Sequence, residues 1–83
     1  MDELFQRLDR AEKHIATVKN KTARKDLLKM VRTIDQAIVV ADMESVECRR
    51  LHKETARYRE LVQKVDSLLA NLEQHITLAT LLG

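Results

Sequence analysis

Apolar residues in the second half of the chain recur at alternating steps of three and four. This stripe consists of Cys48, Leu51, Thr55, Tyr58, Val62, Val65, Leu69, Leu72, Ile76 and Ala79. Eight of the ten are apolar in the broad sense, and the small Cys48 and polar Thr55 are its weak points. A repeat of 3.5 residues is the period of a helix that packs lengthwise on another helix. The stripe predicts a helix over about residues 45–80, which would span ~54 Å.

Two shorter stripes occupy the first half of the chain. They are Leu4, Leu8, Ala11, Ile15 and Val18, and then Leu27, Val31, Ile34, Ile38 and Ala41. The nine residues from Val18 to Leu27 break the phase of three and four. One interpretation is a break near residues 19–22, with Asn20 capping the next helix. The other is a continuous helix over about 2–41, since alanine, arginine and lysine favour helix.

The tetrapeptide Asp-Met-Glu-Ser at 42–45 is the predicted turn. Asp42 or Ser45 would cap the last helix by accepting backbone N–H bonds. Residues 1–83 then form a single all-α domain, an antiparallel hairpin of helices at about 2–41 and 45–80. A break near 19–22 would give a short N-terminal helix and a two-helix core.

The stripe of the last helix is wider than the seam of a two-stranded coiled coil, because Leu61 and Leu68 flank Val62 and Leu69. Three or more helices must meet to cover such a face. The extra cover could be a folded-back N-terminal helix, a second copy of the chain or a foreign partner. Residues 37–41 and 76–82 are also apolar on nearly every side, which favours burial at both ends of the hairpin.

Composition excludes several classes of protein. The 83 residues carry 15 basic and 13 acidic side chains, no proline and a single glycine at the last position. No apolar run approaches the roughly 20 residues of a membrane span, and no signal peptide is visible. The single cysteine cannot form an internal disulfide and fits a reducing compartment. A cytoplasmic protein is expected.

Candidate chemistry is sparse. Cys48 and His52 are four residues apart, a spacing that can hold two metal ligands, but further ligands are remote and Cys48 fits a small buried hydrophobe better. Basic residues cluster at 19–32 and 49–59, yet acidic residues interrupt both runs and aromatics are scarce, which disfavours nucleic acid. No catalytic motif, cofactor site or metal site is expected, and the chain is predicted not to be an enzyme.

The chain resembles a family of small helical-hairpin co-chaperones of type III secretion systems. The likeness covers roughly residues 27–76. It lies in the length, the absence of proline and internal glycine, the tetrapeptide at 42–45, and the pattern Arg50-Leu51, Glu54, Tyr58, Leu61 and the stripe from Val62 to Leu72. The segment 2–18 is longer than the smallest members have. The resemblance implies a partner chaperone of helical repeats that holds the needle subunit in the cytoplasm.

These observations predict a non-enzymatic module that buries an apolar helix face against a helical protein partner, in the manner of a chaperone-like adaptor. The predicted contact residues are Ile34, Ile38, Ala41, Leu61, Val65, Leu68, Leu72 and Ile76. The alternative is self-association as a homo-oligomeric coiled coil or four-helix bundle. A third hypothesis is a nucleic-acid accessory protein that uses the two basic clusters.

Overall fold

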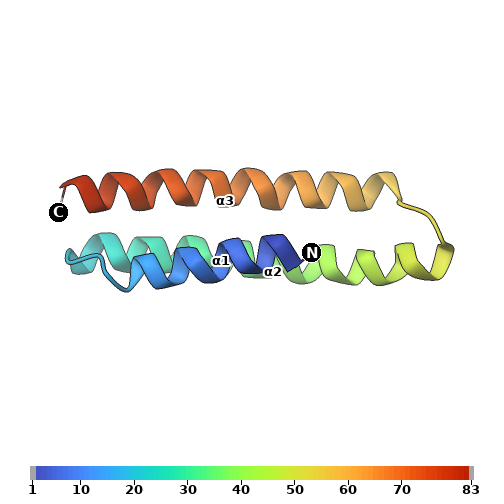
Figure 1. Cartoon of the computed structure of the whole chain (residues 1–83), viewed down its shortest axis with the longest axis horizontal. Coiled ribbons are helices and arrows are strands. Elements are labelled where there is room, and N and C mark those ends of the chain that lie inside the picture. The colour runs from blue at the N-terminus through green and yellow to red at the C-terminus, as the bar shows by residue number, and fades with distance from the viewer. Residues whose placement is uncertain (1, 83) are drawn as a thin grey trace.

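The computed structural model describes residues 2–82, which form three helices. They are α1 (Asp2–Ile15), α2 (Lys21–Leu51) and α3 (Ala56–Leu82). The helix α2 runs in the opposite direction to both α1 and α3 (Figure 1). The molecule is a rod of 48 × 17 × 15 Å. The prediction of an all-α fold is confirmed.

The first break lies at residues 16–20. The backbone of Asn20 is extended, and its side-chain oxygen accepts a hydrogen bond from the Ala23 N–H at 3.0 Å. Arg24 donates to the Val18 carbonyl across the same turn at 3.2 Å. The interpretation with a short N-terminal helix is therefore the right one, and the continuous helix over 2–41 is wrong. The Asn20 cap and the burial of Val18 stabilise the reversal of the chain between α1 and α2. Local helix propensity alone would also allow a continuous helix here.

The predicted turn at 42–45 is wrong, because these residues lie inside α2. They contain no helix breaker, and the helix continues to Leu51. The chain turns at residues 52–55 instead. His52 adopts a left-handed conformation with φ of 54°, and the Lys53 N–H bonds to the Cys48 carbonyl at 3.1 Å. Thr55, rather than Asp42 or Ser45, caps α3 by accepting the Tyr58 N–H at 3.1 Å.

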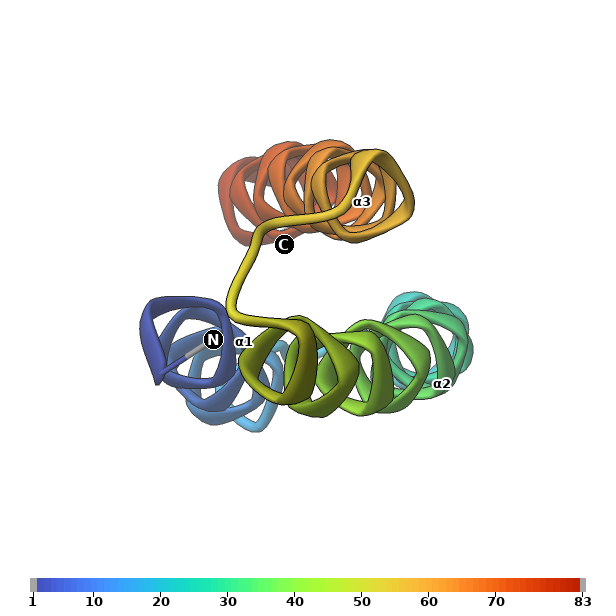
Figure 2. The same ribbon diagram turned by 90° about the vertical axis from the view of Figure 1, so that its right-hand side faces the viewer.

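One apolar core runs along part of the rod. Its buried members are Leu4, Leu8, Ala11, Ile15, Val18, Leu27, Val31, Ile34, Ile38, Ala41, Val65, Leu69, Leu72 and Ile76. The two stripes of the first half are buried completely, and the long stripe is buried in its middle. Figure 2 shows the three helices end-on, with α1 and α2 side by side beneath α3. The folded-back α1 thus provides the third helix that the wide stripe requires.

An ion-pair cluster fixes α1 on α3. The Arg7 guanidinium donates to a Glu73 carboxylate oxygen at 2.7 Å and to Asp66 at 2.5 Å. Both hydrogen bonds raise the pKa of Arg7 above its ordinary value, and the bond to Glu73 has the larger effect. Arg7 is only a quarter exposed. Asp66 and Glu73 are seven residues, or about two helical turns, apart on α3. Because Arg7 contacts both carboxylates, it sets the position of α1 along α3.

Candidate partner-binding surface

The core stops well before the end of the rod at which α2 joins α3. Every residue from 42 to 64 is half-buried or exposed, between the buried Ala41 on α2 and the buried Val65 on α3. The reason is the length of α1, whose N-terminal end lies far short of the α2–α3 turn (Figure 1). We call residues 42–64 the tip. Over most of the tip two helices face each other without a third, and only the first turns of α1 reach it, beside Val62.

The accessible surface is large for a chain of this mass. It measures 6065 Å². A folded monomer of 9.6 kDa is expected to expose about 5,100 Å². The difference of about 1,000 Å² is similar to the ~800 Å² that one protein buries in a standard interface. The elongated shape of 48 × 17 × 15 Å accounts for part of this excess, and the open tip is one segment of the exposed surface.

Polar contacts hold the two helices of the tip together. The Thr55 hydroxyl donates to a Glu44 carboxylate oxygen at 2.9 Å, and the Arg57 Nε lies 3.6 Å from the other oxygen. The Cys48 sulfur lies 3.6 Å from the same hydroxyl. The Glu44 side chain is only 18% exposed. Hydrogen bonds of this kind contribute about 1 kcal/mol each, so they orient the helices without replacing an apolar core.

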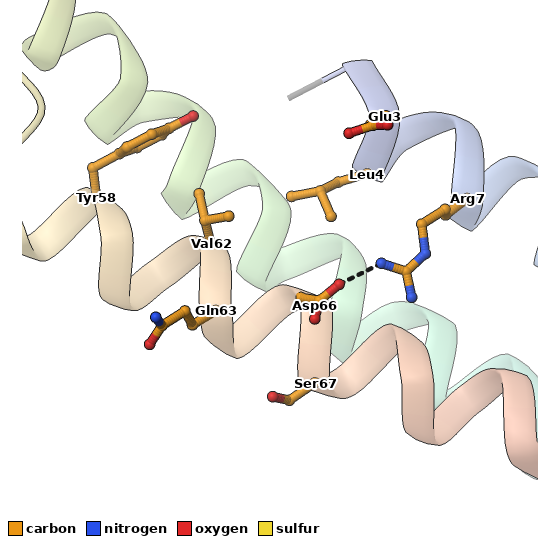
Figure 3. A pocket seen from close by; sticks show the side chains of 8 residues that line it. All are labelled: Glu3, Leu4, Arg7, Tyr58, Val62, Gln63, Asp66 and Ser67. Atoms are coloured by element: carbon orange, nitrogen blue, oxygen red, sulfur yellow. Dashed lines mark hydrogen bonds and ion pairs between the residues drawn. The ribbon is translucent and has the colours of Figure 1, made fainter.

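A groove follows the tip on the side where α1 begins. Its first hollow, of about 560 Å³, has Leu4 of α1 and Tyr58 and Val62 of α3 in its lining. Figure 3 shows these three side chains around the same space, with Arg7 and its Asp66 partner at one end. A second hollow, of about 450 Å³, continues from Tyr58 to Cys48 and the α2–α3 turn. We call the pair the tip groove.

The tip groove lies where a third helix would pack if α1 were longer. It starts at the first turn of α1, where Leu4 is buried, and extends toward the end of α2. The apolar or weakly polar residues of its lining are Leu4, Val62, Tyr58 and Cys48, and the remaining lining residues are polar or charged. A helix that continued the line of α1 would therefore meet a narrow apolar strip with polar and charged residues beside it.

Six of the predicted contact residues lie in the core of the chain itself. Ile34, Ile38, Ala41, Val65, Leu72 and Ile76 are at most 6% exposed and pack against the other helices. Leu61 and Leu68 are half-buried at the edge of the core. The structure thus leaves only these two of the eight near the surface. Tyr58 and Val62, which line the tip groove, belong to the predicted stripe but not to the predicted contact set.

The two segments that are apolar on nearly every side are buried on one side only. In residues 37–41, Ile38 and Ala41 are buried, whereas Val39 and Val40 are exposed. In residues 76–82, Ile76 is buried and Leu78 and Leu81 are exposed, while the side chain of Leu82 lies outside the described part of the chain. Both segments therefore carry apolar side chains on the surface of the isolated molecule.

The Cys48–His52 pair and the basic cluster at 49–59 have the following surroundings in the structure. Residues 2–82 contain no group of three or more His, Cys, Asp or Glu side chains that could hold a metal ion, and Cys48 contacts Thr55 instead. Several basic residues of 49–59 are paired within the chain, Arg50 with Glu47, Arg57 with Glu44 and Arg59 with Glu54.

Neither a known protein family, a curated protein nor a solved structure matches this chain. Within residues 2–82, no helix is long and apolar enough to cross a bilayer. The tip groove is therefore interpreted from its own geometry.

Proposed function

We propose that this chain is a non-enzymatic helical binding module, whose tip groove receives an amphipathic helix of another protein. The observation that carries the proposal is the end of the buried core at Ala41 and Val65, while the apolar stripe continues through Val62 and Tyr58. An apolar stripe that no helix of the chain covers can bind the apolar face of an amphipathic helix. The partner would complete the three-helix arrangement along the whole rod.

The dimensions of the tip define the partner segment. The part of α2 beyond the core, residues 42–51, is about 15 Å long. A partner helix of about three turns, with apolar residues at i, i+3, i+4 and i+7, matches this length. Tyr58 lines both hollows of the groove, so its ring would contact the partner over most of the interface. A partly buried tyrosine at the centre of an interface is a common hot spot.

We further propose that the partner is a cytoplasmic chaperone built of helical repeats, to which this chain acts as co-chaperone. The support is the pattern-level resemblance to the small co-chaperones of type III secretion, which covers roughly residues 27–76 and so includes the whole tip. Chaperones of helical repeats present helix faces at their ends. A short rod with one open end is suited to extend such a stack.

Co-expression with the products of neighbouring genes, followed by purification through a tag on this chain, tests the proposal. We expect one helical-repeat protein to copurify at a fixed stoichiometry. Tyr58→Glu should abolish the complex, because it places a charge in the centre of the groove. Leu78→Glu is the matched control, since Leu78 is an exposed apolar residue near the opposite end of α3.

Circular dichroism of both variants must show unchanged helicity for the comparison to hold. Binding by Tyr58→Glu at wild-type strength would show that the groove is not the interface. The absence of any stoichiometric complex with the neighbouring gene products would contradict the adaptor function itself.

A further inference from the structure

A second apolar surface lies on α2, on a face turned away from the core. Val39, Met43 and Val46 are 51%, 69% and 53% exposed. Their spacing of four and three places them on one face of the helix. Met43 follows the buried Ile34 by nine residues, which is about 180° around the helix. We call these three residues the outer triad, and none of them belongs to the tip groove.

Charged residues flank the outer triad symmetrically. Asp35 precedes Val39 by four residues, and Arg50 follows Val46 by four. Both lie on the same face of α2 as the triad, and both are exposed. The face thus has a midpoint between residues 42 and 43, with valine on each side and opposite charges at the two ends.

A face with this symmetry is complementary to itself in one orientation only. When a second α2 packs antiparallel about the midpoint, Val39 lies opposite Val46 of the second copy and the two Met43 side chains meet near the axis. Each Asp35 then lies opposite Arg50 of the second copy. A parallel arrangement would place Asp35 against Asp35 and Arg50 against Arg50, which like-charge repulsion disfavours.

The charged groups are available for these contacts. No described residue forms an ion pair with Asp35. Arg50 donates its Nε to Glu47 at 3.0 Å, and its side chain is 66% exposed. A guanidinium has five N–H donors, so Arg50 can bind Glu47 of its own chain and Asp35 of the second copy together.

We infer that the outer triad binds a second copy of this chain, antiparallel and on a two-fold axis, with Asp35 and Arg50 as the reciprocal ion pair. Three apolar side chains from each copy make a small interface, so the dimer is weak and depends on concentration. The axis lies near the boundary between core and tip, and the two tips therefore point in opposite directions. Each copy keeps its own tip groove open.

Sedimentation equilibrium over a range of concentrations tests this dimer. The wild-type chain should change from monomer to dimer with a dissociation constant on the order of 100 μM at low salt. Met43→Glu should be monomeric throughout, whereas Leu78→Glu, the control on α3, should dimerise like wild type. A wild-type chain that stays monomeric to about 1 mM would overturn the inference.

Charge reversal tests the orientation. Asp35→Arg and Arg50→Glu should each weaken the dimer by about tenfold, because each replaces two attractive pairs with two repulsive ones. The double variant with both changes should recover the affinity to within about threefold of wild type. Equal loss in the double variant, with helicity unchanged, would exclude the antiparallel register.

The same variants separate this inference from the proposed function. Met43→Glu should still form the complex with the chaperone partner, and Tyr58→Glu should still dimerise. If Met43→Glu loses both activities, the two surfaces are not independent and the inference fails in this form.

Discussion

At the scale of single residues, side-chain caps decide where the helices begin. Asn20 accepts the Ala23 N–H at 3.0 Å, and it is the residue at which α1 and α2 separate. Asn20→Ala should lower the free energy of unfolding by about 1 kcal/mol. Urea denaturation followed by circular dichroism measures the change. Lys19→Ala, at the exposed neighbouring position, is the control and should stay within about 0.5 kcal/mol of wild type. Equal stability of both variants would show that the cap contributes nothing.

The ion pair near the end of α2 gives a prediction of pH dependence. Hydrogen bonds from Arg50 hold the pKa of Glu47 below its ordinary value. The carboxylate therefore stabilises the folded chain fully above the ordinary glutamate pKa. This contribution is lost as the pH falls through the depressed pKa of the folded state. Arg50→Ala should return the pKa of Glu47 to its ordinary range. NMR titration of the Glu47 carboxyl carbon would show it, and superimposable curves for the two proteins would contradict the assignment.

At the scale of the elements, α2 ends at a residue, His52, whose backbone conformation is unfavourable. His52 has a positive φ of 54°, a conformation that costs a residue with a Cβ about 1 kcal/mol. Glycine has no such cost and is the usual residue at this position. His52→Gly should raise the stability by about 1 kcal/mol in thermal and urea unfolding. His14→Gly, in the last turn of α1, should instead lower it by a similar amount. A loss of stability in His52→Gly would mean that the His52 side chain contributes contacts of its own.

The sequence predicted the buried faces of the elements better than their ends. All members of the stripes Leu4–Val18 and Leu27–Ala41 are buried. The spacing of apolar residues along the sequence identifies the buried face of a helix directly. The α2–α3 turn was misplaced because Asp42 and Ser45 are typical capping residues, whereas the true turn has neither glycine nor proline. That turn includes a hydrogen bond between Glu44 and Thr55, eleven residues apart, which no local pattern reveals.

The tip groove could not be predicted for a related reason. The stripe contains Tyr58 and Val62, but their exposure depends on where α1 begins relative to the α2–α3 turn. A turn at 42–45 would have left little of the hairpin uncovered. Moving it to 52–55 lengthens α2 by a few turns and leaves most of residues 42–64 without a third helix. A shift in one loop thus changes which residues are core and which are surface.

At the scale of the whole molecule, stability is unevenly distributed along the rod. Fully buried side chains such as Ile38, Leu69 and Leu72 lie in the three-helix part, and the tip has none. Backbone amides of residues 42–64 should exchange with solvent at least about 100-fold faster than those of 27–41 and 65–76. Hydrogen exchange followed by mass spectrometry measures this directly. Uniform protection along α2 would show that the tip is as stable as the core.

The uncovered tip has a further consequence for the lifetime of the chain. Residues 65–83 contain no lysine or arginine, whereas Arg49, Arg50, Lys53, Arg57, Arg59 and Lys64 all lie in the tip. These six of the 15 basic residues offer a protease that cuts after lysine or arginine sites in the segment that opens most easily, and the other nine lie in residues 7–32. An occupied groove would shield the same bonds. Turnover would in this way match the amount of the chain to the amount of its partner.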